Sequence, residues 1–173
     1  MKFFKQIVPG NCDIIAIEDI FSFLHEYHSF DEIKSKLHRY DFGSWLPDIG
    51  TYLEDMGIKT KLVSNNVDFK SPNEEFEKEL KKYKTKGIFE ERVPLESDIK
   101  DKPVIVNVDA FKIRGEKGGP GAHYVVVLKE NNRLYMYDGW DLDNKVEVDF
   151  ETLYKYSLNI SKFLPKGMWL FLE

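Results

Sequence analysis

The pattern of apolar residues changes near residue 100, and this change limits the possible folds more than any other feature of the sequence. Before it, apolar residues recur at helical spacing in several segments. After it, short runs such as 103–108 and 122–129 are almost continuously apolar, which is typical of buried strands. Helices that precede strands, rather than alternate with them, predict an α+β fold. We expect a helical half (about residues 1–100) packed on an antiparallel sheet (about residues 101–173).

Four segments of the first hundred residues begin with a helix-capping residue and continue with apolar residues at helical spacing. In chain order, the predicted caps are Asn11, Ser29, Ser44 and Ser71. Gly57 and Gly87 follow the third and fourth segments and predict where they end, because glycine readily adopts the left-handed conformation found after many helices. Residues 58–64 lie between these two helices and predict a short strand.

The second half of the sequence predicts a β-hairpin. Asn131 and Asn132 form a turn signal between two apolar runs, 122–129 and 134–137. The remaining predicted elements are a strand at 145–148, a short helix at 150–156 and a strand at 168–172.

Length, charge and cysteine content exclude several classes of protein. A chain of 173 residues fits one domain over 1–173. Its net charge of −5, from 25 basic and 30 acidic residues, disfavours a nucleic-acid partner, because binding to phosphates needs a basic surface. A single cysteine excludes an intramolecular disulfide and a zinc site built from thiolates.

Several patterns that the sequence lacks limit the possible cellular location and the possible cofactors. No run approaches the roughly 20 apolar residues of a membrane span, and the N-terminus lacks the apolar run of a signal peptide. We therefore expect a cytoplasmic protein; the sequence does not indicate its oligomeric state. We expect no metal and no cofactor. The glycine-rich loop 115–121 lacks the Gly-Lys-Ser/Thr of a phosphate loop, and the acidic residues of 138–144 lack the closing glutamate of a calcium loop.

Cys12 is the first candidate for chemistry. It is predicted to begin a helix, where the positive end of the helix dipole stabilises a thiolate. The alternative is a buried apolar residue, because free cysteines are among the most buried residue types. A cysteine nucleophile also needs a base, which is usually a histidine.

His123 is the best-placed base among the four histidines. It begins a strongly apolar strand after a glycine-rich loop, whereas His25, His28 and His38 have the polar neighbours of a solvated helix face. The predicted hairpin brings Asp138 beside His123, where a carboxylate can orient the imidazole. The alternatives are a core histidine with satisfied hydrogen bonds and an aspartate that only begins a turn.

These assignments predict two contacts. The sulfur of Cys12 should lie within about 4–5 Å of one ring nitrogen of His123. An oxygen of Asp138 should lie about 3 Å from the other ring nitrogen. Asp141, Asp143 and Asn107 are the alternatives for the third position.

The order Gln6, Cys12, His123, Asp138 resembles that of papain-like cysteine peptidases. More narrowly, the chain is similar to the double-glycine leader peptidases, which process bacteriocin precursors, and to their stand-alone relatives. The resemblance implies a papain-like α+β fold with an active site between its two halves, and a peptide or protein as the substrate. It covers most of the chain, through the stretches 5–24, 43–57, 102–106, 121–127 and 135–138.

The resemblance also implies a role for each of the four residues. Cys12 is the expected nucleophile. His123 takes the thiol proton and returns it to the leaving amine, and Asp138 orients His123. Gln6 supplies a side-chain donor to the oxyanion hole, together with the backbone N–H of Cys12. The implied reaction is hydrolysis of a peptide or amide bond through a thioester.

Two departures from the family leave other functions open. The family usually has glycine after the cysteine, but this chain has Asp13, and a neighbouring negative charge disfavours a thiolate. The family often has proline after the third residue, where this chain has Gly139. Asp13 therefore favours the first alternative function, a catalytically inactive papain-like domain that binds a peptide segment. The second alternative is a transamidase or acyltransferase that uses Cys, His and Asp.

Overall fold

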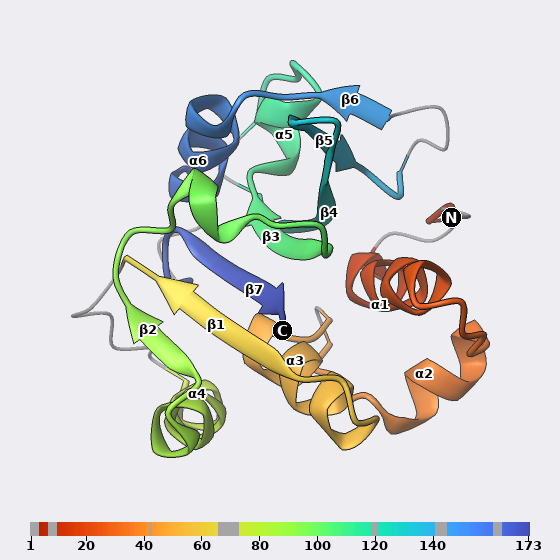
Figure 1. Ribbon diagram of the computed structural model, residues 1–173. Helices are drawn as coiled ribbons and strands as arrows, with labels where there is room; N and C mark the ends of the chain where they lie inside the picture. Colours follow the sequence, from red (N-terminus) through yellow and green to blue (C-terminus); the bar gives the residue numbers. More distant parts are fainter. Residues whose placement is uncertain are drawn as a thin grey trace.

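The protein is built on one mixed β-sheet with helices on both of its faces (Figure 1). The computed structural model describes residues 4–6, 10–41, 43–65, 73–118, 121–140, 145–160 and 164–173. The α-helices in these ranges are α1 (Cys12–Phe23), α2 (Phe30–Lys36), α3 (Leu46–Asp55), α4 (Glu74–Lys86), α5 (Ala110–Ile113) and α6 (Phe150–Leu158). The strands are β1 (Thr60–Ser64), β2 (Phe89–Glu91), β3 (Val104–Val108), β4 (His123–Glu130), β5 (Arg133–Tyr137), β6 (Lys145–Glu147) and β7 (Met168–Leu172), and a 3-10 helix spans Glu96–Asp98.

The strand order is β2-β1-β7-β3-β4-β5-β6. All neighbouring strands are antiparallel except β1 and β2, which are parallel. The α+β class is therefore confirmed, and α1 and α3 pack on the sheet as expected. The strand predicted at 58–64 is present as β1. The sheet differs from the expectation because β1 joins it from the predicted helical half, together with the unpredicted strand β2, and because these two strands are parallel. β2 has only three residues, which is too short for a periodic pattern to reveal.

The position of β4 in the sheet explains why its sequence is continuously apolar rather than alternating. Tyr124, Val126 and Leu128 belong to the core cluster that includes residues of α1 and α3. Val125 and Val127 belong to a second cluster on the other face, together with a buried leucine of α6. A strand that is covered on both faces has no position for an exposed polar side chain.

The predicted hairpin is present between β4 and β5. Asn131 and Asn132 have φ angles of 51° and 63°, the left-handed conformation that a tight two-residue turn requires. The register pairs Val126 with Tyr137, so the residue after β5 returns toward the start of β4. This register sets the position of Asp138 relative to His123.

The helix caps follow the sequence only in part. Helix α1 begins at Cys12 as predicted, but the side chain of Asn11 forms no capping bond. The predicted cap at Ser29 is confirmed, because its side chain accepts a hydrogen bond from the N–H of Glu32. The predicted cap at Ser44 is wrong, since its hydroxyl donates to the carbonyl of His38 instead.

The first turns of α3 and α4 are capped by other residues. At α3, the carboxylate of Asp48 accepts the backbone N–H of Trp45 at 3.1 Å. At α4, the side chain of Asn73 accepts two backbone N–H groups, and the predicted cap Ser71 lies outside the described residues. Gly87 ends α4 in the left-handed conformation, as predicted. No helix within the described ranges has both the length and the apolar character needed to cross a membrane.

Candidate active site

Cys12 is the first residue of α1, and it is half-buried. Its side chain lines a small cavity together with Gln6, His123 and Gly139. These residues come from the N-terminal segment, the start of β4 and the turn after β5, so the cavity joins segments that are far apart in the sequence. Most of α1 behind Cys12 is buried, which holds the thiol at a fixed position against the sheet.

The imidazole of His123 interacts with two side chains, those of Asp138 and Cys12. Its Nε2 atom is 2.6 Å from Oδ1 of Asp138, which leaves Nδ1 as the ring nitrogen available to Cys12. The imidazole is 5% exposed. Burial by itself lowers the pKa of His123, but hydrogen bonds to Asp138 and Cys12 and the charges of both residues outweigh burial and raise the pKa to about 9. These interactions favour the protonated ring, the form that stabilises a neighbouring thiolate.

Asp138 follows β5 directly and is surrounded by donors. Its Oδ1 also accepts the backbone N–H of Trp140 at 3.0 Å, and its Oδ2 lies 3.3 Å from Nε of Arg114. Burial by itself raises the pKa of Asp138, but hydrogen bonding and attraction to His123, with smaller effects from Trp140 and Arg114, lower the pKa to about 2. Asp138 is therefore ionised throughout the neutral range.

Gln6 is buried and lines the same cavity as Cys12 and His123. Its backbone N–H donates to the carbonyl of Gly139 at 2.5 Å. This hydrogen bond attaches the N-terminal segment to the turn that follows Asp138. The four residues expected from the sequence therefore lie together in the fold.

Asp138 occupies the third position at the imidazole, and the alternative Asn107 lies in β3, where its backbone pairs with Tyr124. Asp141 and Asp143 lie outside the described residues. The contact expected between His123 and Asp138 is thus present, at a distance shorter than the expected 3 Å.

The sequence analysis missed two residues beside Asp138. Arg114 ends the short helix α5, and its guanidinium lies 4.8 Å from the ring centroid of Trp140. Trp140 is 40% exposed, so it forms part of the surface next to the buried carboxylate. The only sequence signal is that Trp140 lies two residues after Asp138; nothing in the sequence connects Arg114 with either residue.

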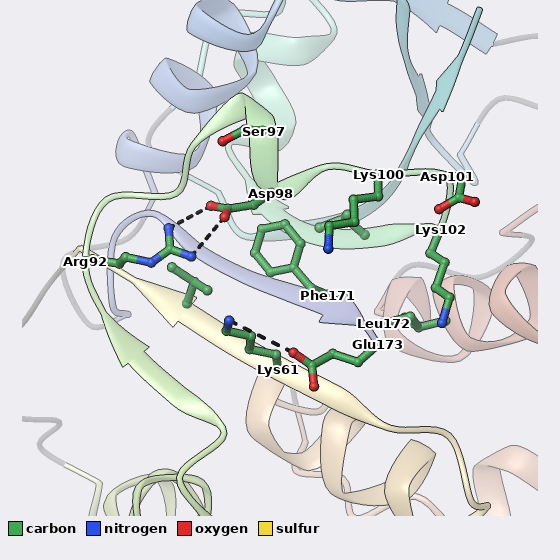
Figure 2. A pocket seen from close by; sticks show the side chains of 12 residues that line it. Lys61, Arg92, Ser97, Asp98, Lys100, Asp101, Lys102, Phe171, Leu172 and Glu173 are labelled. Atoms are coloured by element: carbon green, nitrogen blue, oxygen red, sulfur yellow. Dashed lines mark hydrogen bonds and ion pairs between the residues drawn. The ribbon is translucent and has the colours of Figure 1, made fainter. Parts of the chain in front are cut away.

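A larger pocket lies on another part of the sheet (Figure 2). It has a volume of about 350 Å³, and its lining includes Lys61, Arg92 and Phe171. Two of its basic residues have acidic partners within the lining: Lys61 forms an ion pair with Glu173 at 4.0 Å, and Arg92 forms two hydrogen bonds with Asp98, at 2.7 and 3.0 Å. None of the four predicted site residues lines this pocket, so its size does not mark the place of the predicted chemistry.

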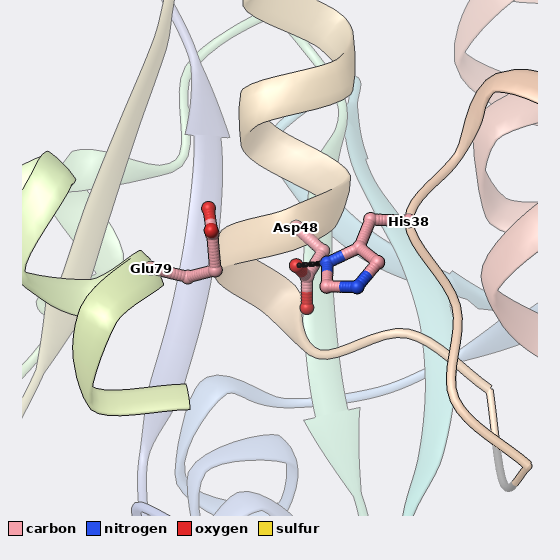
Figure 3. Close-up of side chains that lie close together, drawn as sticks. All are labelled: His38, Asp48 and Glu79. Carbon is pink, nitrogen blue, oxygen red and sulfur yellow. Dashed lines mark hydrogen bonds and ion pairs between the residues drawn. The ribbon is translucent and has the colours of Figure 1, made fainter. Parts of the chain in front are cut away.

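Three side chains lie close enough together for metal binding: His38, Asp48 and Glu79, whose ligand atoms lie within 4.8 Å of one another (Figure 3). Each already has a protein partner. Nδ1 of His38 lies 3.0 Å from Asp48, which also caps α3, and Glu79 forms an ion pair with Lys82 at 2.5 Å. Burial raises the pKa of Asp48 to about 6, although hydrogen bonds from His38 and Trp45 oppose the shift. These contacts account for the cluster as part of the helix packing.

Comparisons with known proteins give the fold a name. No protein-family model matches the sequence, and a search of curated proteins gives no match. Among solved structures, the peptidase domain of Streptococcus ComA, a bifunctional ABC transporter of a quorum-sensing pathway, aligns with a TM-score of 0.60 and 16% identity. The alignment covers 99% of this chain and 96% of that domain.

Two further structures have the same fold. One is a double-glycine motif protease from an AMS/PCAT transporter in complex with the leader peptide (TM-score 0.56, 12% identity, 98% of this chain and 89% of that chain). The other is a C39-like peptidase from Bacillus anthracis (TM-score 0.54, 11% identity, 99% of this chain and 93% of that chain). At these identities the similarity is one of fold. The papain-like α+β fold expected from the sequence is confirmed.

Proposed function

We propose that residues 1–173 form one papain-like domain that hydrolyses a peptide or amide bond through a thioester to Cys12. The observation that carries this proposal is the position of His123, which lines one small cavity with Cys12 and is hydrogen-bonded to Asp138. A cysteine, an imidazolium and a buried carboxylate in this order form the arrangement that activates a thiol as a nucleophile.

In the first half-reaction, the sulfur of Cys12 attacks the carbonyl carbon and the carbonyl π electrons move to oxygen. The backbone N–H of Cys12 and the side-chain amide of Gln6 stabilise that oxyanion. His123 then transfers its Nδ1 proton to the leaving amine as the carbon–nitrogen bond breaks. A thioester and a neutral imidazole remain.

In the second half-reaction, a water molecule attacks the thioester while His123 accepts one of its protons. The carbon–sulfur bond breaks, the acid product leaves, and the thiolate–imidazolium pair is restored. Asp138 keeps its charge throughout and stabilises the imidazolium. Its low pKa, which the imidazolium causes despite burial, fits this role.

The proposed substrate is a peptide or a protein. Support comes from the fold, because one structure with this fold is a protease in complex with its leader peptide. The same fold and residues serve other acyl transfers, so we do not restrict the proposal to double-glycine leaders.

Covalent labelling tests the proposal without a known substrate. An epoxide or aldehyde peptide should modify the wild-type protein at Cys12, detected by mass spectrometry, and Cys12→Ala should abolish the signal because the chain has one cysteine. His123→Ala should slow labelling at pH 7 at least about tenfold, since the imidazolium that stabilises the thiolate is lost. His25→Asn is the matched control, because His25 is exposed and asparagine tolerates its φ of 60°.

The same measurement separates hydrolysis from the two alternatives. Iodoacetamide should alkylate Cys12 well below pH 8 if the cysteine and histidine form a reactive pair. Alkylation that is slow below pH 8 and unchanged in His123→Ala would contradict the proposal and favour a peptide-binding domain. A transamidase would give an amide product when an amine is supplied with the acyl donor, whereas a hydrolase gives the acid.

A further inference from the structure

Asp13 is the residue that most separates this chain from an ordinary cysteine peptidase. It directly follows Cys12, and its side chain is 1% exposed. A buried carboxylate beside a nucleophilic sulfur is unfavourable for a thiolate unless its charge is balanced. The partners of Asp13 therefore affect the proposed chemistry.

Arg39, which lies three residues after α2, supplies the balancing charge. Its Nε lies 2.9 Å from Oδ2 of Asp13, and its Nη2 lies 3.3 Å from Oδ1. The same Nη2 donates to the carbonyl of Gly10 at 2.7 Å and to the side chain of Asn11 at 3.0 Å. One guanidinium thus contacts residues on both sides of Cys12.

The loop that carries Arg39 is fixed against the same turn. The backbones of Tyr40 and Gly43 form a β-bridge, and the N–H of Ser44 donates to Oδ2 of Asp13 at 2.8 Å. Gly43 has a φ of 113°, and a Cβ at this position would lie 3.4 Å from Oδ2 of Asp13. The loop therefore approaches Asp13 closely and directs two donors, from Arg39 and Ser44, at its carboxylate.

We propose that Arg39 is a positioning residue for the hydrolysis: it neutralises Asp13 and fixes the turn whose backbone N–H donates to the oxyanion at Cys12. This inference rests on the proposed function. It also explains how Asp13 is compatible with a reactive cysteine, because the carboxylate is one half of an ion pair. Three of the contacts that define the turn, to Gly10, Asn11 and Asp13, depend on the planar fork of an arginine.

Two measurements separate the charge effect from the positioning effect. The pH midpoint of iodoacetamide alkylation reports how readily the sulfur ionises and does not involve an oxyanion. The affinity for a peptide aldehyde reports the oxyanion hole, because the aldehyde forms a tetrahedral adduct with a negatively charged oxygen.

Asp13→Asn tests the charge. This variant keeps the size of the side chain and leaves the cation of Arg39 beside the sulfur, so the alkylation midpoint should move to lower pH, with about a tenfold faster rate on the acidic side of the wild-type midpoint. Arg39→Gln should move the midpoint to higher pH. The double variant, with Asp13→Asn and Arg39→Gln, should have a midpoint near that of the wild type. A midpoint that is identical in Asp13→Asn and the wild type would overturn the charge part of the inference.

Arg39→Lys tests the positioning. A lysine keeps the charge but cannot contact Gly10, Asn11 and Asp13 together, so aldehyde affinity should fall about tenfold with little change in the alkylation midpoint. Unchanged aldehyde affinity would overturn the positioning part. Arg92→Gln is the matched control, because it removes a bidentate ion pair with Asp98 that lies outside the site. Thermal melts of all variants identify any that fail to fold. If Arg39→Gln does not fold, Arg39→Lys and Asp13→Asn still test the role of Arg39.

Failure of this inference differs from failure of the proposed function. If His123→Ala alkylates as fast as the wild type, the proposed function fails, whatever the Arg39 variants do. If His123→Ala is slow but the Arg39 and Asp13 variants match the wild type, only the role of Arg39 is wrong.

Discussion

The Nε2 atom of His123 lies 2.6 Å from Oδ1 of Asp138, and both side chains are more than nine-tenths buried. A hydrogen bond between an imidazolium and a carboxylate is among the stronger ones in proteins, and burial strengthens it further. It fixes the plane of the ring and leaves Nδ1 outside this hydrogen bond.

Asp138→Asn should impair the reaction while keeping the shape of the site. Asparagine can accept a hydrogen bond from Nε2, but it carries no charge to stabilise the imidazolium. The rate at which a peptide epoxide modifies Cys12 at pH 7 should fall by about 10² or more. Asp149→Asn is the control, because Asp149 caps α6 and asparagine caps equally well. Labelling of Asp138→Asn at the wild-type rate would exclude an orienting role.

The histidine–aspartate pair should make stability depend on pH in both directions. The pKa of His123 is raised from 6.5 to about 9, so its contribution is complete below pH 6.5 and is lost as the pH rises through about 9. The pKa of Asp138 is lowered from 3.8 to about 2, so its contribution is complete above pH 3.8 and is lost as the pH falls through about 2.

Urea unfolding of the wild type and of His123→Gln, measured from pH 5 to 10, tests the histidine side of this dependence. The difference in the free energy of unfolding should be largest near pH 6 and should shrink up to about pH 9. Because the ring interacts with both Asp138 and Cys12, the midpoint of this change belongs to the coupled groups rather than to His123 alone. A difference that stays constant over the whole range would mean that His123 does not hold its proton in the folded state.

Gln6→Ala should weaken only those reactions that create an oxyanion. Loss of one oxyanion donor costs about 2.7–4 kcal/mol, so the affinity for a peptide aldehyde should fall by about 10²–10³. Alkylation by iodoacetamide forms no oxyanion, and its rate should stay within about twofold of the wild type. Equal losses in both measurements would indicate a disturbed cavity rather than a missing donor.

Gly50→Ala should destabilise the protein although alanine favours helix formation. A Cβ at this position in α3 would lie 1.7 Å from the hydroxyl of Tyr83 and 2.9 Å from Cδ1 of Leu170. Such overpacking costs about 1–3 kcal/mol, more than the roughly 1 kcal/mol gained in helix propensity. Thr51→Ala, the next residue of the same helix, lacks this clash and serves as the control in thermal unfolding. A raised melting temperature for Gly50→Ala would show that α3 can move away from the sheet.

The parts of the structure that the sequence predicted are those that depend on local signals. The Asn131–Asn132 turn determined the hairpin and its register, and the register placed Asp138 beside His123. The start of α1 at Cys12 followed from the residues around it. No local pattern predicts that Cys12 and His123 line one cavity, because the two residues are far apart in the sequence.

The parts that the sequence did not predict depend on contacts between distant residues. Arg39 and Asp13 are 26 positions apart, and neither belongs to a periodic pattern. Arg114 lies 24 positions before Asp138, in a segment whose helix has only four residues. At α3, Ser44 stands where a helix cap was expected, but its hydroxyl bonds to the carbonyl of His38. Asp48 caps the helix instead.

Strand β7 lies in the interior of the sheet, with β1 on one side and β3 on the other, and all of its residues are buried (Figure 1). Of the strands in the described ranges it is the last in the sequence. During synthesis, β1 and β2 therefore emerge without the strand that joins them to β3, and each group exposes an unpaired edge until β7 inserts between them. The segment that carries Cys12 is made before β7, but the sheet that supports His123 becomes continuous only after β7 has left the ribosome.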